Sequence, residues 1–265
     1  NVTYIGYGAF SGCANMISIN VSPNNKAFKS KEGVLFNYNK NGRYFIPFGV
    51  ETIKKYAFSC CKYLSSITIP ISVTEIGSFA FEYCEGLSSI IIPPKITSMD
   101  SYAFGNCDKL SLVIYLGESN LDSENVFRYC NKLAKVHVLP TYSSDSFCNE
   151  MPVRKCINID SCGASTKYIF DNCTGTLFIS GQGAMSDYTN EPAPWSLYKD
   201  NITSVIIEGG VTSVGNKGFS EFSEITSVTI LSSVESIGES AFSGCSNLEN
   251  IIFEEESNLT IIGKS

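Results

Sequence analysis

The feature that most constrains this chain is a 23-residue period. Four copies run without interruption between Val50 and Leu139, and five apolar columns keep the same step through all of them. The columns are Phe58, Phe81, Phe104 and Phe127; Cys61, Cys84, Cys107 and Cys130; Leu64, Leu87, Leu110 and Leu133; Ile67, Ile90, Val113 and Val136; and Ile69, Ile92, Tyr115 and Val138. Further copies lie at Ile5–Val21, Val211–Leu231 and Val234–Glu254. A fixed period of this length predicts a repeat architecture.

A single copy cannot fold alone. Each offers about six apolar side chains, worth roughly 1.5–3 kcal/mol apiece when buried. Ordering the backbone costs about 1–2 kcal/mol for every residue of the copy, and this total exceeds the free energy gained by burying those side chains. Neighbouring copies must therefore cover both faces of each one, and the predicted fold is a solenoid.

Two patterns within a copy predict its local structure. The segment L-x-x-I-x-I-P alternates with the period of a strand, so we expect a concave parallel sheet. The segment I-G-x-x-A-F-x-x-C has apolar residues three and four apart, which is typical of a helical turn. We therefore expect an α/β solenoid with short helices or turns on the convex side.

The period is interrupted twice, and the interruptions suggest three segments. Residues 1–139 hold repeats with a β-hairpin inserted near 24–49, whose strands flank Asn41–Gly42. Residues 140–201 form a cap or connecting segment, with a hairpin around Asn172–Gly175 and Trp195 packed on a proline corner. Residues 202–265 form a second run, truncated at its end. One continuous curve with a bulky insertion is the alternative.

Charge and composition narrow the class of partner. A net charge of −7 argues against nucleic acid or an anionic membrane, because both require clustered lysine and arginine. No apolar run approaches the roughly 18 residues of a membrane helix, so we expect no membrane insertion here. A start at Asn1 without methionine indicates a processed or recombinant piece.

N-x-[ST] sequons favour the secretory route and an extracellular or cell-surface location. One lies at Asn1, and the candidate glycosylation sites are Asn20, Asn172, Asn201 and Asn258.

The 11 cysteines fall into two groups. Those in the repeat column, including Cys13 and Cys245, are expected to be inert core thiols, because Phe222 takes the same place in one copy. Metal ligands or a disulfide ladder would be the functional alternative. Outside the repeats, one or two disulfides are expected among Cys148, Cys156, Cys162 and Cys173, with connectivity open. Cys60 is expected to be a single exposed or partly buried thiol.

Strand positions between the buried columns should point away from the core. They carry apolar side chains on neighbouring copies, where polar ones are usual. The residues are Ile91, Leu112, Ile114, Leu116, His137 and Leu139. We expect an exposed patch that binds protein. The alternative is that a cap or the middle segment covers it.

No constellation of catalytic residues is evident. His137, the only histidine, occupies a strand position where other copies have Thr68, Ile91 and Ile114, which indicates a surface variant. Glu254, Glu255 and Glu256 read as a solvated loop rather than a metal site. We therefore expect no enzyme, cofactor or metal in this chain.

The string I-G-x-x-A-F-x-x-C-x-x-L-x-x-I-x-I-P resembles the BspA-like, or Treponema pallidum type, leucine-rich repeat. Residues 162–195, with TGTLFISGQGAM and PW, look like the segment that precedes such repeats in surface proteins of trichomonads and some host-associated bacteria. Departures are Phe222, Gly218 and Val126. The resemblance implies a cell-surface or secreted adhesin that binds host matrix proteins such as fibronectin or fibrinogen, or other microbes. A structural spacer or pattern-recognition scaffold is the alternative function.

Overall fold

The computed structural model describes residues 4–5, 18–20, 34–37, 43–46, 49–253 and 257–264, and it describes side chains from Ile46 onward. The chain forms two compact units, Asn1–Lys155 (unit 1) and Cys156–Ser265 (unit 2). The expected connecting segment, 140–201, is thus divided between them, with 140–155 in unit 1 and the rest in unit 2. Each unit has its own hydrophobic core.

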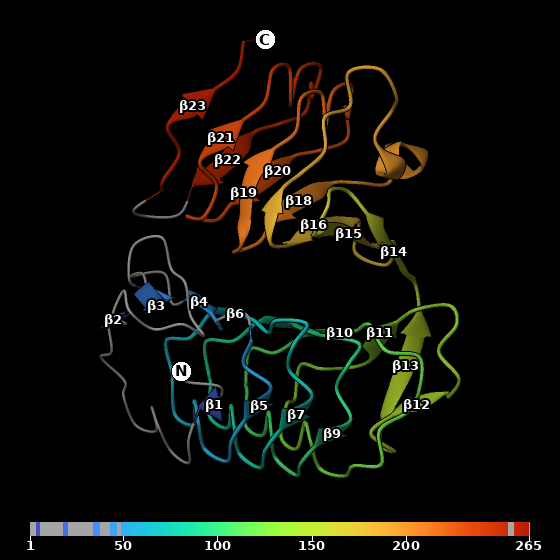
Figure 1. Cartoon of the computed structure of the whole chain (residues 1–265). Coiled ribbons are helices and arrows are strands. Elements are labelled where there is room, and N and C mark those ends of the chain that lie inside the picture. The colour runs from blue at the N-terminus through green and yellow to red at the C-terminus, as the bar shows by residue number, and fades with distance from the viewer. Residues whose placement is uncertain are drawn as a thin grey trace. The chain divides into compact units, whose positions relative to one another are not determined.

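Unit 1 is a solenoid whose strands lie in two rows (Figure 1). One row is a sheet of short parallel strands: β1 (Tyr4–Ile5), β5 (Thr52–Ile53), β7 (Glu75–Ile76) and β9 (Ser98–Met99). The other row has the longer strands: β8 (Ser89–Ile92), β10 (Leu112–Tyr115), β11 (Val136–Val138) and β13 (Met151–Lys155), with β12 (Ser146–Phe147) antiparallel at its end. Val113 pairs with Ile90 and with Val136, so the sequence period is the register step of the sheet.

The strands expected to pair across Asn41–Gly42 each pair elsewhere. β3 (Val34–Asn37) runs antiparallel to β2 (Ser18–Asn20). β4 (Arg43–Phe45) runs parallel to β6 (Ser66–Thr68), 23 residues later, and so behaves as an ordinary repeat strand. The Asn41–Gly42 turn itself lies outside the described residues.

Of the short helices or turns expected on the convex side, the described residues form turns. Among the described residues the helical segment is η1 (Pro194–Tyr198), a 3-10 helix outside the regular repeats. Phe79 and Tyr83 have φ of 59° and 57°, which is left-handed backbone that an α-helix cannot contain. Apolar residues three and four apart therefore reach the core from consecutive tight turns.

Hydrogen bonding explains why turns replace a helix. The N–H groups of Phe79, Phe81 and Tyr83 donate to carbonyls of the following repeat, at Ser101, Ala103 and Gly105. The N–H groups of the alternate residues, Ala80, Glu82 and Cys84, donate three residues back within their own turn. Half of the donors are thus committed to the neighbouring repeat, and the remaining bonds close tight turns. Stacking of the repeats therefore provides hydrogen-bond partners for these backbone N–H groups, as buried backbone requires.

The core of unit 1 is a column of stacked phenylalanine rings. Centroids of Phe58 and Phe81 lie 5.1 Å apart, those of Phe81 and Phe104 4.9 Å, and those of Phe104 and Phe127 5.6 Å. Phe147 closes the end of the core and lies 4.7 Å from the Tyr115 ring. Stacking of like side chains in this column is therefore one of the ways in which each repeat stabilises the next.

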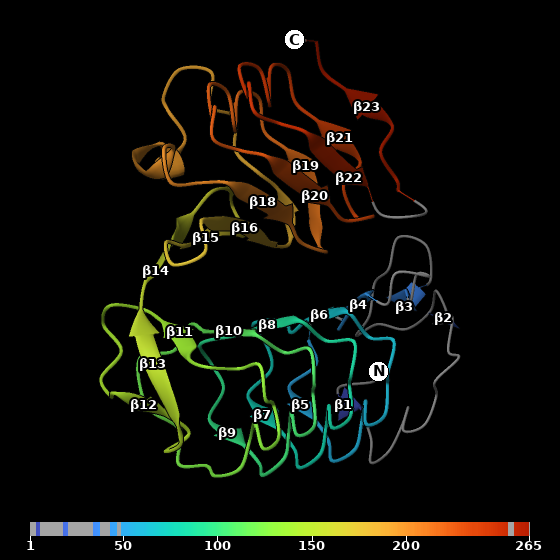
Figure 2. The same ribbon diagram turned by 180° about the vertical axis from the view of Figure 1, so that it is seen from behind.

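Unit 2 also has two rows of strands, seen from both sides in Figures 1 and 2. The main sheet contains β14 (Ile157–Ser161), β15 (Thr166–Asp171), β16 (Thr176–Gly181), β18 (Ser204–Ile207), β20 (Ser227–Ile230) and β22 (Asn250–Phe253). The second contains β17 (Gly183–Ala184), β19 (Val211–Val214), β21 (Ser236–Ile237) and β23 (Ile261–Ile262). β14, β15 and β16 are antiparallel, and parallel pairing begins between β16 and β18. The antiparallel strands cap the solenoid.

Trp195 begins the aromatic column of unit 2. Its ring is fully buried and stacks on Phe219 at 5.4 Å, and Phe219 stacks on Phe242 at 5.2 Å. The indole Nε1 donates to the Gly218 carbonyl at 3.0 Å. Two departures from the repeat pattern, Gly218 and Phe222, therefore occur in the turn that receives this cap, and Phe222 also packs edge-on against Phe219.

Candidate interaction face

The longer-strand sheet of unit 1 has one side directed away from the core, which we call the outward face. Strand alternation places Val113 and Tyr115 in the core and turns Leu112 and Ile114 to the other side. The register puts Ile91, Ile114 and His137 side by side on three neighbouring strands. The six residues that strand alternation predicts for this face are Ile91, Leu112, Ile114, Leu116, His137 and Leu139.

The outward face is less exposed than expected. Ile114 is only 1% exposed, and the other five residues are half-buried. Within the patch that was expected to be exposed, Ile114 is therefore closed to solvent, whereas the other five residues are partly accessible. Its neighbours in the register are Ile91 and His137, and Leu112 lies two residues before it on the same side of β10.

The outward face changes character along the sheet. Next to His137 in the register lies Arg154 on β13, and Lys135 precedes β11 with its side chain exposed. The outward face therefore has apolar side chains at its centre and basic side chains at one edge. This combination suits a protein surface that offers apolar and acidic side chains together.

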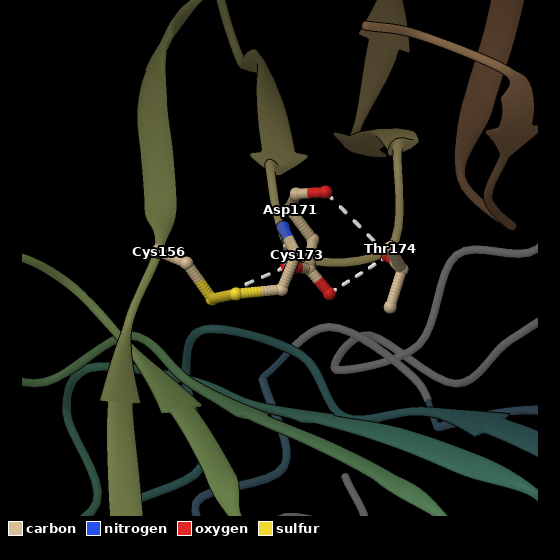
Figure 3. Close-up of a disulfide and its surroundings, with 4 residues drawn as sticks. All are labelled: Cys156, Asp171, Cys173 and Thr174. Carbon is tan, nitrogen blue, oxygen red and sulfur yellow. Dashed lines mark hydrogen bonds between the residues drawn. A yellow bond between two sulfur atoms is a disulfide. The ribbon is translucent and has the colours of Figure 1, made fainter.

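Two of the four cysteines outside the repeats form a disulfide. Cys156 and Cys173 are bonded, with Cα atoms 5.9 Å apart, and Figure 3 shows the bond joining the start of β14 to the turn after β15. The buried Asp171 carboxylate accepts hydrogen bonds from the Cys173 N–H at 3.0 Å and the Thr174 hydroxyl at 2.9 Å. The disulfide and this carboxylate together fix the turn that holds the Asn172 sequon.

Cys148 and Cys162 are buried thiols outside any disulfide. Burial, with a contribution from Glu150, raises the pKa of Cys148 to about 12. Burial also raises the pKa of Cys162 to about 11. Both side chains pack in the core of their unit.

The raised pKa of Cys148 predicts that unit 1 loses stability in alkali. An unfolded thiol titrates near pKa 8.5, so above about pH 8.5 the unfolded chain has released a proton that the folded chain keeps. The free energy of unfolding should fall by up to about 1.4 kcal/mol per pH unit between pH 8.5 and 10. Urea unfolding at several pH values measures this, and Cys148→Ala should reduce the slope by this amount. The Cys84 thiol, whose pKa burial raises, and the Cys107 thiol, whose pKa is raised by a hydrogen bond with Cys130 and by burial, maintain the remainder. An unchanged slope in that variant would rule out this thiol as the cause.

Cysteines of the repeat column donate their thiol hydrogens to the backbone. Cys84 Sγ donates to the Phe58 carbonyl at 3.3 Å, Cys107 to Phe81 at 3.2 Å, and Cys130 to Phe104 at 2.9 Å. Cys245 repeats the contact in unit 2, with Phe219 at 3.1 Å. The column thus has a structural use, linking each turn to the one before. Cys13 lies outside the described residues, and Cys60 is half-buried.

Three of the candidate glycosylation sites have exposed side chains in the structure, namely Asn172, Asn201 and Asn258. Asn20 belongs to β2, but its side chain is outside the description, as are Asn1 and Glu254–Glu256. Among the described residues, no helix is long and apolar enough to cross a membrane.

The repeat geometry agrees with one known family. The family described as "BspA type Leucine rich repeat region (6 copies)" matches residues 1–111, 51–176 and 195–265. This chain belongs to that family. The BspA-type repeat here is therefore a strand-and-turn unit with two hydrogen-bonded strand rows, and its phenylalanine and cysteine columns share the core with leucine, isoleucine and valine columns.

Solved structures provide more distant comparisons. A leucine-rich repeat protein from Eubacterium ventriosum is 32% identical over 40% of this chain and 28% of its own, with a TM-score of 0.37. One from Bacteroides ovatus is 21% identical over 99% and 79%, with a TM-score of 0.38. A protein from Faecalibacterium prausnitzii, described as a leucine rich cell surface protein, is 16% identical over 82% and 92%, with a TM-score of 0.27. No curated protein sequence matches the chain.

Proposed function

We propose that this chain is an adhesin-like interaction module of a cell-surface or secreted protein, and that it binds macromolecules through the outward face. Membership of a repeat family whose folds serve as interaction scaffolds supports this, as does the F. prausnitzii surface protein among its structural relatives. The observation that carries the proposal is the run of apolar side chains on in-register strands, bordered by Arg154 and Lys135. Host matrix proteins such as fibronectin or fibrinogen are the partners to test first.

The binding role predicts specific effects of substitution on the outward face. Leu112→Ser and Ile91→Thr introduce the residues that neighbouring repeats carry at the same strand positions, Ser89 and Thr68. The folded chain should therefore tolerate them. Removing buried apolar contacts from an interface centre should weaken partner binding about tenfold or more. Surface plasmon resonance of the full chain on immobilised fibronectin and fibrinogen measures the effect.

A matched control lies in unit 2. Ile206 is a half-buried outward residue of β18, and Thr229 occupies the next strand in register, so Ile206→Thr makes the same chemical change at an equivalent position. Binding should survive in that variant. Equal loss in Ile206→Thr and Ile91→Thr would refute the assignment to unit 1.

A spacer that presents other domains is the second candidate. The 1% exposure of Ile114 favours it, because a side chain closed to solvent offers little to a partner. Failure of the unsubstituted chain to bind any matrix protein would select this candidate over the adhesin.

A further inference from the structure

The turns of unit 1 place aromatic side chains on left-handed backbone. Five such residues have φ between 57° and 64°: Tyr56, Phe79, Tyr83, Tyr102 and Tyr129. Left-handed backbone favours glycine and asparagine and is unfavourable for bulky side chains. In the turns of unit 2 the corresponding positions hold Lys217, Glu221, Ser240 and Gly244. The aromatic residues of unit 1 thus adopt an unfavourable backbone conformation, which persists only where the surrounding contacts stabilise it.

Packing accounts for one of the two aromatic columns. Tyr56 stacks on Phe79 at 5.0 Å, and Phe79 stacks on Tyr102 at 5.4 Å. The other column alternates, with Asn106 between Tyr83 and Tyr129. These two tyrosines are 43% and 54% exposed. With Tyr63, they are the exposed aromatic side chains of residues 49–155.

The spacing of the exposed rings suits a regular polymer. Tyr83 and Tyr129 are two turns apart, and stacked strands repeat at about 4.8 Å, so the rings recur at about 10 Å along the solenoid. An extended β-1,4-linked glycan turns the same face of every second sugar outward at nearly this distance. Pyranose rings pack their C–H faces on aromatic rings, much as other flat rings do.

Polar groups between and beside the tyrosines complete the surface. The Asn106 amide donates to the Glu82 carboxylate at 3.4 Å, and both groups can exchange hydrogen bonds with sugar hydroxyls. The Arg128 guanidinium lies 5.1 Å from the centre of the Tyr129 ring and holds one side of it. We propose that Tyr83, Asn106 and Tyr129 form a binding surface for an extended β-1,4-linked polysaccharide, on the turn side of unit 1 and separate from the outward face.

Tyrosine and arginine are also common at the centres of protein interfaces. Such centres pack against further apolar side chains, whereas the other large apolar residues exposed in residues 49–155 are Tyr63 and Ile71. The two-turn interval and the polar residue within it therefore favour the glycan.

Isothermal titration of the full chain with cellobiose, cellotriose, cellohexaose and chitohexaose tests the proposal. A trisaccharide is the shortest chain that can cover both rings, so cellotriose should bind about tenfold more tightly than cellobiose. Tyr83→Asn combined with Tyr129→Asn should remove this gain and weaken cellohexaose binding about tenfold. Asparagine already adopts the required backbone at Asn106, with φ of 56°, so this variant should fold.

Two controls separate the outcomes. Tyr63→Ser removes the third exposed ring and should leave glycan binding within about threefold, a shift of less than 1 kcal/mol. Leu112→Ser should leave glycan binding unchanged, so that failure of the outward-face proposal remains distinguishable. Absence of binding to both hexasaccharides, or equal binding by the asparagine variant, would overturn the proposal. Loss of fibronectin binding in that variant, without any glycan binding, would identify a protein surface instead.

Discussion

Replacing Phe104 by alanine should lower the free energy of unfolding of unit 1 by about 3–5 kcal/mol, the usual cost of removing a buried aromatic ring. Phe104 is fully buried and lies between Phe81 and Phe127 in the stacked column. Its loss therefore leaves a cavity with a ring on each side. Neighbouring repeats cannot close that cavity without breaking their own strand register. Urea unfolding followed by far-ultraviolet circular dichroism measures the change.

Tyr102→Asn in the same turn is the matched control. Tyr102 is half-buried and stacks on Phe79 alone among the aromatic contacts of the described residues, so its removal should cost at most about 1.5 kcal/mol. Trp195, the only tryptophan, belongs to the core of unit 2, and the urea dependence of its fluorescence should be unchanged in both variants. A cost for Phe104→Ala no greater than for Tyr102→Asn would contradict a core organised around the phenylalanine column.

Trp195→Ala should destabilise unit 2 by about 3–5 kcal/mol while leaving unit 1 unaffected. The indole ring lies at the end of the aromatic column formed by the described residues, and it also contacts the Tyr168 and Tyr188 rings at 5.5 and 5.2 Å. Without it, the first regular turn of unit 2 would expose its core. The urea dependence of Cys162 and Cys245 labelling, located by peptide mass spectrometry, reports unit 2 after the fluorophore is removed.

Trp195→Phe separates the two contributions of this side chain. It keeps a ring against Phe219 but leaves the Gly218 carbonyl without its donor, so the cost should be about 1–3 kcal/mol. Equal and small effects of both substitutions would show that the antiparallel strands cap unit 2 without help from Trp195.

The repeat architecture was readable in the sequence because one turn of the solenoid has a fixed length. Columns such as Phe58, Phe81 and Phe104 became stacked rings, and the 23-residue step became the register of the parallel sheets. Strand positions were equally clear, since alternation of buried and outward residues depends only on the pleat. β4 escaped recognition as a repeat strand because its copy lacks the surrounding columns.

The turn side was not readable, because spacing of three and four residues describes both a helical turn and successive tight turns. Positions with left-handed backbone are usually occupied by glycine or asparagine, which makes them recognisable in a sequence. Here Tyr56, Phe79 and Tyr102 occupy such positions, so composition concealed the turns. Hydrogen bonds to the next repeat determine that turns form instead of a helix, and these bonds cannot be inferred from a single copy of the pattern.

The composition of the outward face was predicted in part. Alternation placed Ile91, Ile114 and His137 on one face, and the register brings them together. Their exposure could not be derived, because it depends on the side chains that surround each residue in three dimensions. The exposed tyrosines at positions 83 and 129 were missed for the same reason as the turns that carry them.

Hydroxyl-radical footprinting of the full chain, alone and saturated with fibronectin or fibrinogen, tests the binding role most directly. It reports solvent access to individual leucine and histidine side chains. A bound partner should protect Leu112, Leu116, His137 and Leu139, while Leu197, which is 87% exposed in unit 2, should remain equally reactive. Saturable binding that leaves those four residues unprotected, or no binding to either protein, would contradict the binding role.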